Sequence, residues 1–175
     1  MSALNYDIPG LAIINHQILI EARNRGDLKE VTKNILSYPG YAILKDFDVF
    51  NQAQTMSLLY CVLVVPKELW RNRDDPIYKE VAKLNPENLF IVEESNPNYS
   101  NYPAYWLIHY LRNALAHINY EYEMTDEWIY TFWNVNQKTG LTNWKVKISA
   151  ANLETFITSV GYLLANTALS EKNKR

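Results

Sequence analysis

Hydrophobic residues recur along most of the chain at the three- and four-residue spacing of amphipathic helices. The clearest example lies near the C-terminus, where one helical face carries Leu153, Phe156, Ile157, Val160, Leu163 and Leu164. Asp75-Pro76 marks a helix start, because Asp caps helices and proline is tolerated at the first helical position. The pattern predicts main helices over residues 11–22, 49–65, 103–118 and 151–169, and shorter ones over 28–36 and 76–84.

Capping residues and prolines set the expected boundaries of these helices. Asp27 is expected to cap the helix over 28–36, and Asp46 or Asp48 the helix that begins near residue 49. Pro66 is expected to break or kink that helix, because proline cannot donate the next backbone hydrogen bond. Residues 85–103 contain three prolines and five asparagines, so they are predicted to form the longest irregular segment.

The periodicity changes from helical to alternating after residue 126. Residues 127–135 are rich in β-branched and aromatic side chains, and Thr142, Trp144, Val146 and Ile148 alternate with polar residues. The loop 136–140 ends in Gly140, which predicts a β-hairpin. The expected fold is therefore all-α: a four-helix up-and-down bundle with short extra helices and a hairpin at about 127–148, between the last two main helices. One domain is expected over 1–175, with a flexible tail at about 170–175.

Composition excludes some function classes and leaves others open. Of the 175 residues, 48% are hydrophobic and 21% are charged, which is typical of a folded globular domain. A net charge of −2 argues against a general nucleic-acid coat, although not against a nuclease that contacts a few nucleotides. The single cysteine, Cys61, lies in an apolar run and is interpreted as a core residue. Without a signal peptide, a disulfide or a membrane-length apolar run, a cytoplasmic location is expected.

The most unusual segment of the sequence is the hexapeptide Arg112-Asn113-Ala114-Leu115-Ala116-His117, within an apolar helix. At about 100° per residue, a single arc of roughly 140° on this helix contains His109, Arg112, Asn113, Ala116 and His117. The opposite side carries Leu107, Leu111, Ala114, Leu115 and Ile118. The polar face contains no Glu, Lys or Gln, so it differs from an ordinary solvated helix face.

These residue types are sufficient for cleavage of RNA without a metal. An Arg guanidinium matches phosphate oxygens, an imidazole transfers protons near neutral pH, and a carboxamide can donate to an oxyanion or orient the imidazole. A structural interpretation is also open, in which Arg112 pairs with a carboxylate of Glu93, Glu94 or Asp126. His16, alone in an apolar helix, is interpreted as structural. No His-x-x-x-His pattern or Glu/His cluster has the spacing of a metal site, so neither a metal nor a cofactor is expected.

The hexapeptide resembles the Arg-(four residues)-His motif of the HEPN superfamily, in which a polar residue often follows the Arg. In that superfamily the motif lies on a late helix of a four-helix bundle. The segment 130–140 and the strand after it are similar to the hairpin of a small stand-alone, bacterial and plasmid-borne branch. The similarity is clearest over residues 105–169. A tyrosine that follows the His by two positions in one toxin branch is replaced here by Asn119, with Tyr120 one position later, which makes regulation through that tyrosine doubtful.

The resemblance implies a homodimer in which two motif helices build one composite site. It also implies a metal-independent endoribonuclease that leaves a 2′,3′-cyclic phosphate, in a toxin or antiphage-defence role and in some systems with an antitoxin partner. The matched positions of the motif imply that Arg112 and His117 form the catalytic pair and that Asn113 is the supporting residue. His109 is an additional candidate. The alternative is a non-catalytic HEPN dimer that binds nucleotides or RNA or serves as an assembly module.

Overall fold

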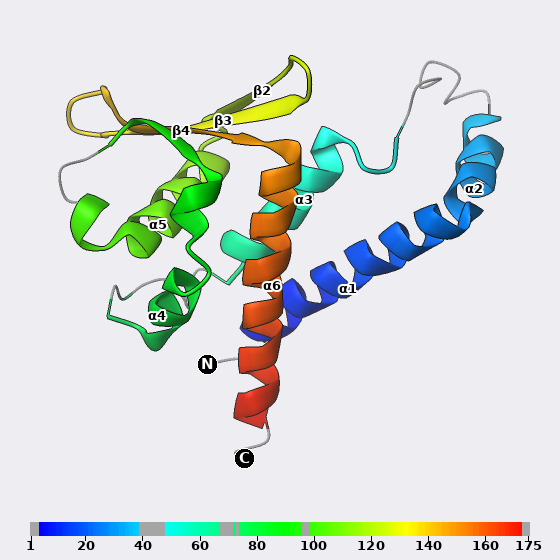
Figure 1. Cartoon of the computed structure of the whole chain (residues 1–175), viewed down its shortest axis with the longest axis horizontal. Coiled ribbons are helices and arrows are strands. Elements are labelled where there is room, and N and C mark those ends of the chain that lie inside the picture. The colour runs from blue at the N-terminus through cyan, green and yellow to red at the C-terminus, as the bar shows by residue number, and fades with distance from the viewer. Residues whose placement is uncertain (1–3, 39–47, 67–71, 73, 96–98, 173–175) are drawn as a thin grey trace.

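The computed structural model describes residues 4–38, 48–66, 72, 74–95 and 99–172 (Figure 1). Helices make up most of these residues, and a four-stranded sheet covers one end of the helical part. The helices are α1 (Leu4–Arg25), α2 (Asp27–Leu36), α3 (Gln52–Leu63), α4 (Pro76–Ala82), α5 (Pro103–Ala116) and α6 (Ala150–Lys172), with short 3-10 turns at Pro86–Leu89 and Tyr99–Asn101.

The long helices pack through small residues and a continuous apolar core. The first half of α1 lies against α6 and α3, and α3 also contacts α5. Gly161 of α6 faces Ile13 so closely that an added Cβ would come within 2.3 Å of the Ile13 Cγ1 atom. Beyond this crossing α1 extends away from the sheet to α2, in which no side chain is buried.

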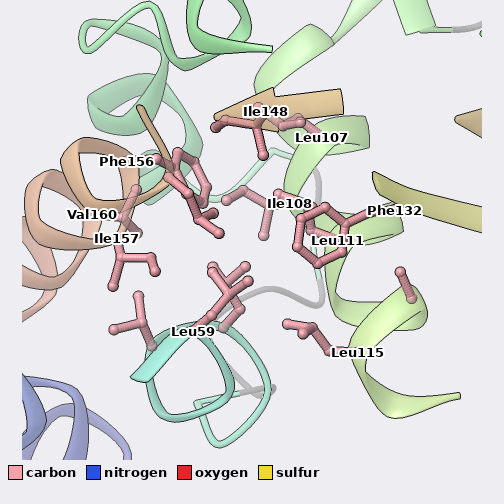
Figure 2. Close-up of a cluster of buried hydrophobic side chains, with 14 of the residues drawn as sticks. Leu59, Leu107, Ile108, Leu111, Leu115, Phe132, Ile148, Phe156, Ile157 and Val160 are labelled. Atoms are coloured by element: carbon pink, nitrogen blue, oxygen red, sulfur yellow. The ribbon is translucent and has the colours of Figure 1, made fainter. Parts of the chain in front are cut away.

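The sheet is antiparallel throughout, with the strand order β1-β4-β3-β2. Its strands are β1 (Ile91–Glu94), β2 (Tyr120–Met124), β3 (Trp128–Val135) and β4 (Thr142–Ser149). The inner face packs on α5 and α6. Figure 2 shows Phe132 and Ile148 of the sheet meeting Leu107, Ile108 and Leu111 of α5, and Phe156 of α6. Burial of these large side chains is the main source of stability at this end of the molecule.

The fold class predicted from the sequence was only partly right. The chain is mostly helical, but the expected hairpin at 127–148 is the centre of a four-stranded sheet, so the all-α description is replaced by a mixed one. β1 lies inside the segment 85–103 that was predicted to be irregular. All four of its residues are exposed, so it has no hydrophobic alternation to reveal it. β2 was missed as well, because it is a short, largely exposed strand at the opposite edge.

Several helix boundaries differ from the prediction for local reasons. Asp27 is the first residue of α2 rather than its cap, since Gly26 occupies the cap position with φ of 85°. Asn51 caps α3 in place of Asp48, its Oδ1 accepting from the Gln54 amide at 3.1 Å; Asp46 lies outside the described residues. Asp75 caps α4 as predicted. α6 continues to Lys172, so part of the expected tail is helical, and residues 173–175 are not described.

Within the described ranges, no helix is both long enough and apolar enough to cross a membrane.

Candidate functional site

The predicted site residues lie on α5 or, in the case of His117, at its C-terminal cap. Pro103 occupies its first position, and its buried face consists of Leu107, Ile108, Leu111, Ala114 and Leu115, together with Ala104 and Tyr110. Packing of this face against the sheet and α3 fixes the rotation of the helix. The remaining face, which holds His109, Arg112 and Asn113, is half-buried, and His117 at the C-terminal end is exposed.

The end of α5 is a strained Schellman turn. The Asn119 amide donates to the Ala114 carbonyl at 2.8 Å and the Ile118 amide to the Leu115 carbonyl at 3.4 Å. Ile118 holds the left-handed position with φ of 57°, where glycine is usual and a β-branched side chain is strained. The turn places His117 at the helix cap and sends Asn119 back toward the sheet, where its carbonyl accepts from the Trp133 amide at 3.1 Å. The sequence pattern gave no indication of this turn.

A pocket of about 620 Å³ lies between α5 and the turn that joins β3 to β4. Three of the four predicted site residues, His109, Asn113 and His117, line it together. Arg112, the fourth, does not belong to its lining. The other lining residues are Trp106, Tyr110, Asn119, Asn134, Val135, Asn136, Gln137 and Lys138.

A chain of three carboxamides connects the motif to the sheet. Asn113 Nδ2 donates to Asn134 Oδ1 at 3.3 Å, and Asn134 Nδ2 donates to Asn143 Oδ1 at 2.7 Å. Asn143 has no cross-strand partner, because Asn134 pairs with Trp144 and Val135 with Thr142. This one-residue bulge turns Asn143 toward Asn134, whereas simple alternation from Trp144 would point it to the other face. Asn113 is therefore held in one orientation by the sheet.

The same amide of Asn113 also lies 3.4 Å from His109 Nε2. An amide nitrogen can only donate, so Nε2 is the unprotonated nitrogen of this imidazole. His109 packs among aromatic rings, stacked on Tyr105 and edge-on to Trp106 and Tyr110. Burial lowers the pKa of His109 below the ordinary value, and the nearby Arg112 charge lowers it further. The imidazole is therefore neutral at pH 7.

This environment predicts that acid destabilises the protein through His109. The unfolded chain binds a proton near the ordinary pKa of 6.5 and the folded chain only at lower pH, so stability decreases as the pH falls below that value. We expect the melting temperature to drop between about pH 7.5 and about pH 5.5, and to drop less in His109→Gln. Thermal unfolding of both proteins across this range is the measurement. Equal pH dependence in the two proteins would contradict the assignment.

Arg112 lies on the α4 side of the helix rather than in the pocket. Its positive charge acts on the Tyr78 hydroxyl of α4 as well as on His109. Burial is the larger influence on Tyr78 and raises the pKa of its phenol, while Arg112 opposes that shift. Of the carboxylates considered as partners for Arg112, Glu93 forms ion pairs with Lys147 at 2.9 Å and Lys145 at 3.2 Å.

Two residues given a structural interpretation from the sequence lie away from the pocket. His16 is 5% exposed, its Nε2 atom is 3.3 Å from Glu154 Oε1, and its ring meets Phe50 edge-on. Cys61 is half-buried, and burial raises the pKa of its thiol, which disfavours a reactive thiolate. In the part of the chain that is described, no group of three or more His, Cys, Asp or Glu side chains is arranged to hold a metal ion.

The pocket also contains residues that the sequence pattern did not single out. Trp106 and Tyr110 precede Asn113 by about two turns and one turn of α5, and residues 136–138 lie in the β3–β4 turn. The usable signal was the predicted hairpin loop, which is rich in amides and comes after the motif helix. That signal could not show which side of the sheet the loop faces.

One comparison with known proteins gave a match. The model of the family described as HEPN pEK499 p136 matches residues 2–170, nearly the whole chain. Neither the search of curated proteins nor the search of solved structures gave a match.

Proposed function

Because the chain belongs to the HEPN pEK499 p136 family, we propose that it is a metal-independent endoribonuclease. The observation that carries this proposal is the convergence of His109, Asn113 and His117 on one pocket. Two imidazoles in one pocket supply both a proton acceptor and a proton donor, which cleavage at a 2′-hydroxyl requires. The fixed carboxamide between them matches the supporting role expected from the resemblance.

The proposed reaction is an in-line attack of the RNA on itself. His109 is neutral at pH 7, and its Nε2 atom exchanges the 3.4 Å contact with Asn113 Nδ2 for the RNA and removes the proton of the 2′-hydroxyl. The 2′-oxygen then forms a bond to phosphorus while the bond from phosphorus to the 5′-oxygen breaks. His117, the second imidazole of the pocket, gives a proton to the departing 5′-oxygen. The products are a 2′,3′-cyclic phosphate and a 5′-hydroxyl, so atoms and charge balance without a further reactant.

A homodimer would complete the site. The pocket of one chain contains the imidazoles but not the Arg112 guanidinium, so the phosphate charge has no arginine opposite it there. Ala116 and Ile118 are exposed beside His117, which leaves a small and an apolar residue on this surface for a second copy. We propose that two α5 helices meet here across a two-fold axis and that each chain supplies Arg112 to the pocket of the other. A toxin or antiphage-defence role, with or without an antitoxin, fits such an activity.

The proposal predicts cleavage of single-stranded RNA in the presence of EDTA. A fluorescently labelled RNA should be cut, the products should carry a 2′,3′-cyclic phosphate and a 5′-hydroxyl, and the all-deoxy version should remain intact because it lacks the attacking 2′-oxygen. End-group analysis by mass spectrometry makes the measurement. Products with a 5′-phosphate would contradict the mechanism, and a dimer that cleaves no RNA would favour the assembly module.

A further inference from the structure

The pocket that holds the imidazoles continues past them along α5 and under the β3–β4 turn. Trp106 and Tyr110 of α5 line one part of it, stacked with 5.3 Å between ring centroids and 26° between ring planes. Asn136, Gln137 and Lys138 of the turn line another. A volume of about 620 Å³ lies within the range of pockets that bind small ligands, and it is large enough to hold a nucleotide. Proton transfer at one phosphate does not need this additional space.

The lining of the pocket has the chemistry of a nucleotide site. It combines an aromatic surface, several carboxamides and one lysine, and it includes no carboxylate among the residues described. Aromatic rings stack on unpaired bases, and a lysine attracts phosphate. A carboxamide presents a donor and an acceptor side by side, the arrangement that pairs with the N6 amino group and N7 of adenine, and cytosine has no ring nitrogen on that edge.

The carboxamides in the pocket fall into two groups. The first group already has hydrogen-bond partners within the protein. Asn113 donates to Asn134, which donates to Asn143, and Asn136 Oδ1 accepts from the Lys138 amide at 2.9 Å in the turn. Asn119 and Gln137 make no side-chain hydrogen bond with any residue in the described part of the chain. Their donors and acceptors are thus available to a ligand. The strained turn at Ile118 keeps Asn119 beside His117, next to the proposed site of cleavage.

From this arrangement we propose that the pocket binds one unpaired nucleotide of the RNA next to the scissile phosphate, and that it prefers adenine. Trp106 stacks on the base, Asn119 and Gln137 read its edge, and Lys138 contacts a neighbouring phosphate. The inference rests on the proposed function in placing the nucleotide beside the cleavage site. The β3–β4 turn then has a role in substrate choice that is separate from the chemistry of α5.

Deoxyribose oligonucleotides test this proposal without cleavage, because they lack the 2′-hydroxyl. We expect labelled oligo(dA) of about six nucleotides to bind the unaltered protein at least about fivefold more tightly than oligo(dC), measured by fluorescence anisotropy. Trp106→Ala should weaken binding of both by about tenfold, and Trp106→Phe, which keeps a flat ring, should restore most of it. Gln137→Ala and Asn119→Ala should remove the preference for oligo(dA) and leave oligo(dC) nearly unchanged.

A matched control separates these effects from general damage. Asn166 of α6 is an exposed carboxamide outside the pocket, so Asn166→Ala should leave both affinities unchanged. Equal affinity for the two oligonucleotides, or a Trp106→Ala protein that melts normally and binds as well as the unaltered one, would overturn the inference. RNA cleavage with no base preference would refute the nucleotide site alone. Base-selective binding with no RNA cleavage would refute the nuclease alone.

Discussion

Alanine at His117 or at Arg112 is expected to lower RNA cleavage by at least about 100-fold, since each change removes a group that acts on the transition state. Equimolar mixing of the two inactive proteins should then restore about a quarter of the unaltered activity. The restoration follows from the proposed exchange of Arg112 between pockets. In a mixed dimer one pocket receives an intact Arg112 and an intact His117, and the other receives neither.

The size of the restored activity distinguishes the possible arrangements of the site. Random exchange of subunits makes about half of the dimers mixed, and each mixed dimer has about half of its sites intact, which gives the quarter. If Arg112 and His117 of the same chain acted together, mixing would restore nothing. The separation of Arg112 from the pocket that contains His117 is the reason to expect action between chains. Size-exclusion chromatography of each variant must show that the dimer persists, because a monomeric unaltered protein would refute the composite site.

The helical part of the fold was readable from the sequence because its signals are local. The helices around Leu58, Leu111 and Phe156 bury one face each, and the Asp75-Pro76 start needs only neighbouring residues. The periodicity of the α-helix placed His109, Asn113 and His117 on one side of α5, and all three line the pocket. Helical angle fixes which residues share a face, so this much of the site required no tertiary information.

The remaining features depend on contacts between distant segments. The helical angle of 100° per residue also placed Arg112 on the polar face of α5, at the edge of that face. In the structure Arg112 lies near Tyr78 and does not line the pocket. β1 forms only because β4 offers it a partner, and its own residues are exposed. The bond from Asn134 to Asn143 needs a bulge that reverses the expected side of Asn143. The bulge lies before Trp144, where the buried apolar alternation of β4 begins, so hydrophobic periodicity does not reveal it.

The largest effect on stability is expected at Trp144, which connects the sheet to the wall of the pocket. This side chain is fully buried, and its ring lies 5.3 Å from that of Tyr110, which in turn stacks on Trp106. Trp144→Ala removes this support and leaves a cavity, so we expect the free energy of unfolding to fall by about 3–5 kcal/mol. Urea denaturation followed by circular dichroism measures the loss. Trp133→Ala, on the opposite face of the neighbouring strand and half-buried, should cost clearly less.

Trp144→Phe separates the packing of this ring from its polar atom. The Nε1 group of Trp144 is buried and meets no acceptor in the described part of the chain, so replacing the indole breaks no hydrogen bond to a described residue. Phenylalanine removes that donor and fills most of the space, and the net loss should stay below about 1.5 kcal/mol. If Trp144→Phe were as damaging as Trp144→Ala, the indole nitrogen would have to make a bond that matters for stability. An aromatic ring at position 144 supports Tyr110, which in turn stacks on Trp106. We therefore expect oligo(dA) binding to survive in Trp144→Phe and to be lost in Trp144→Ala.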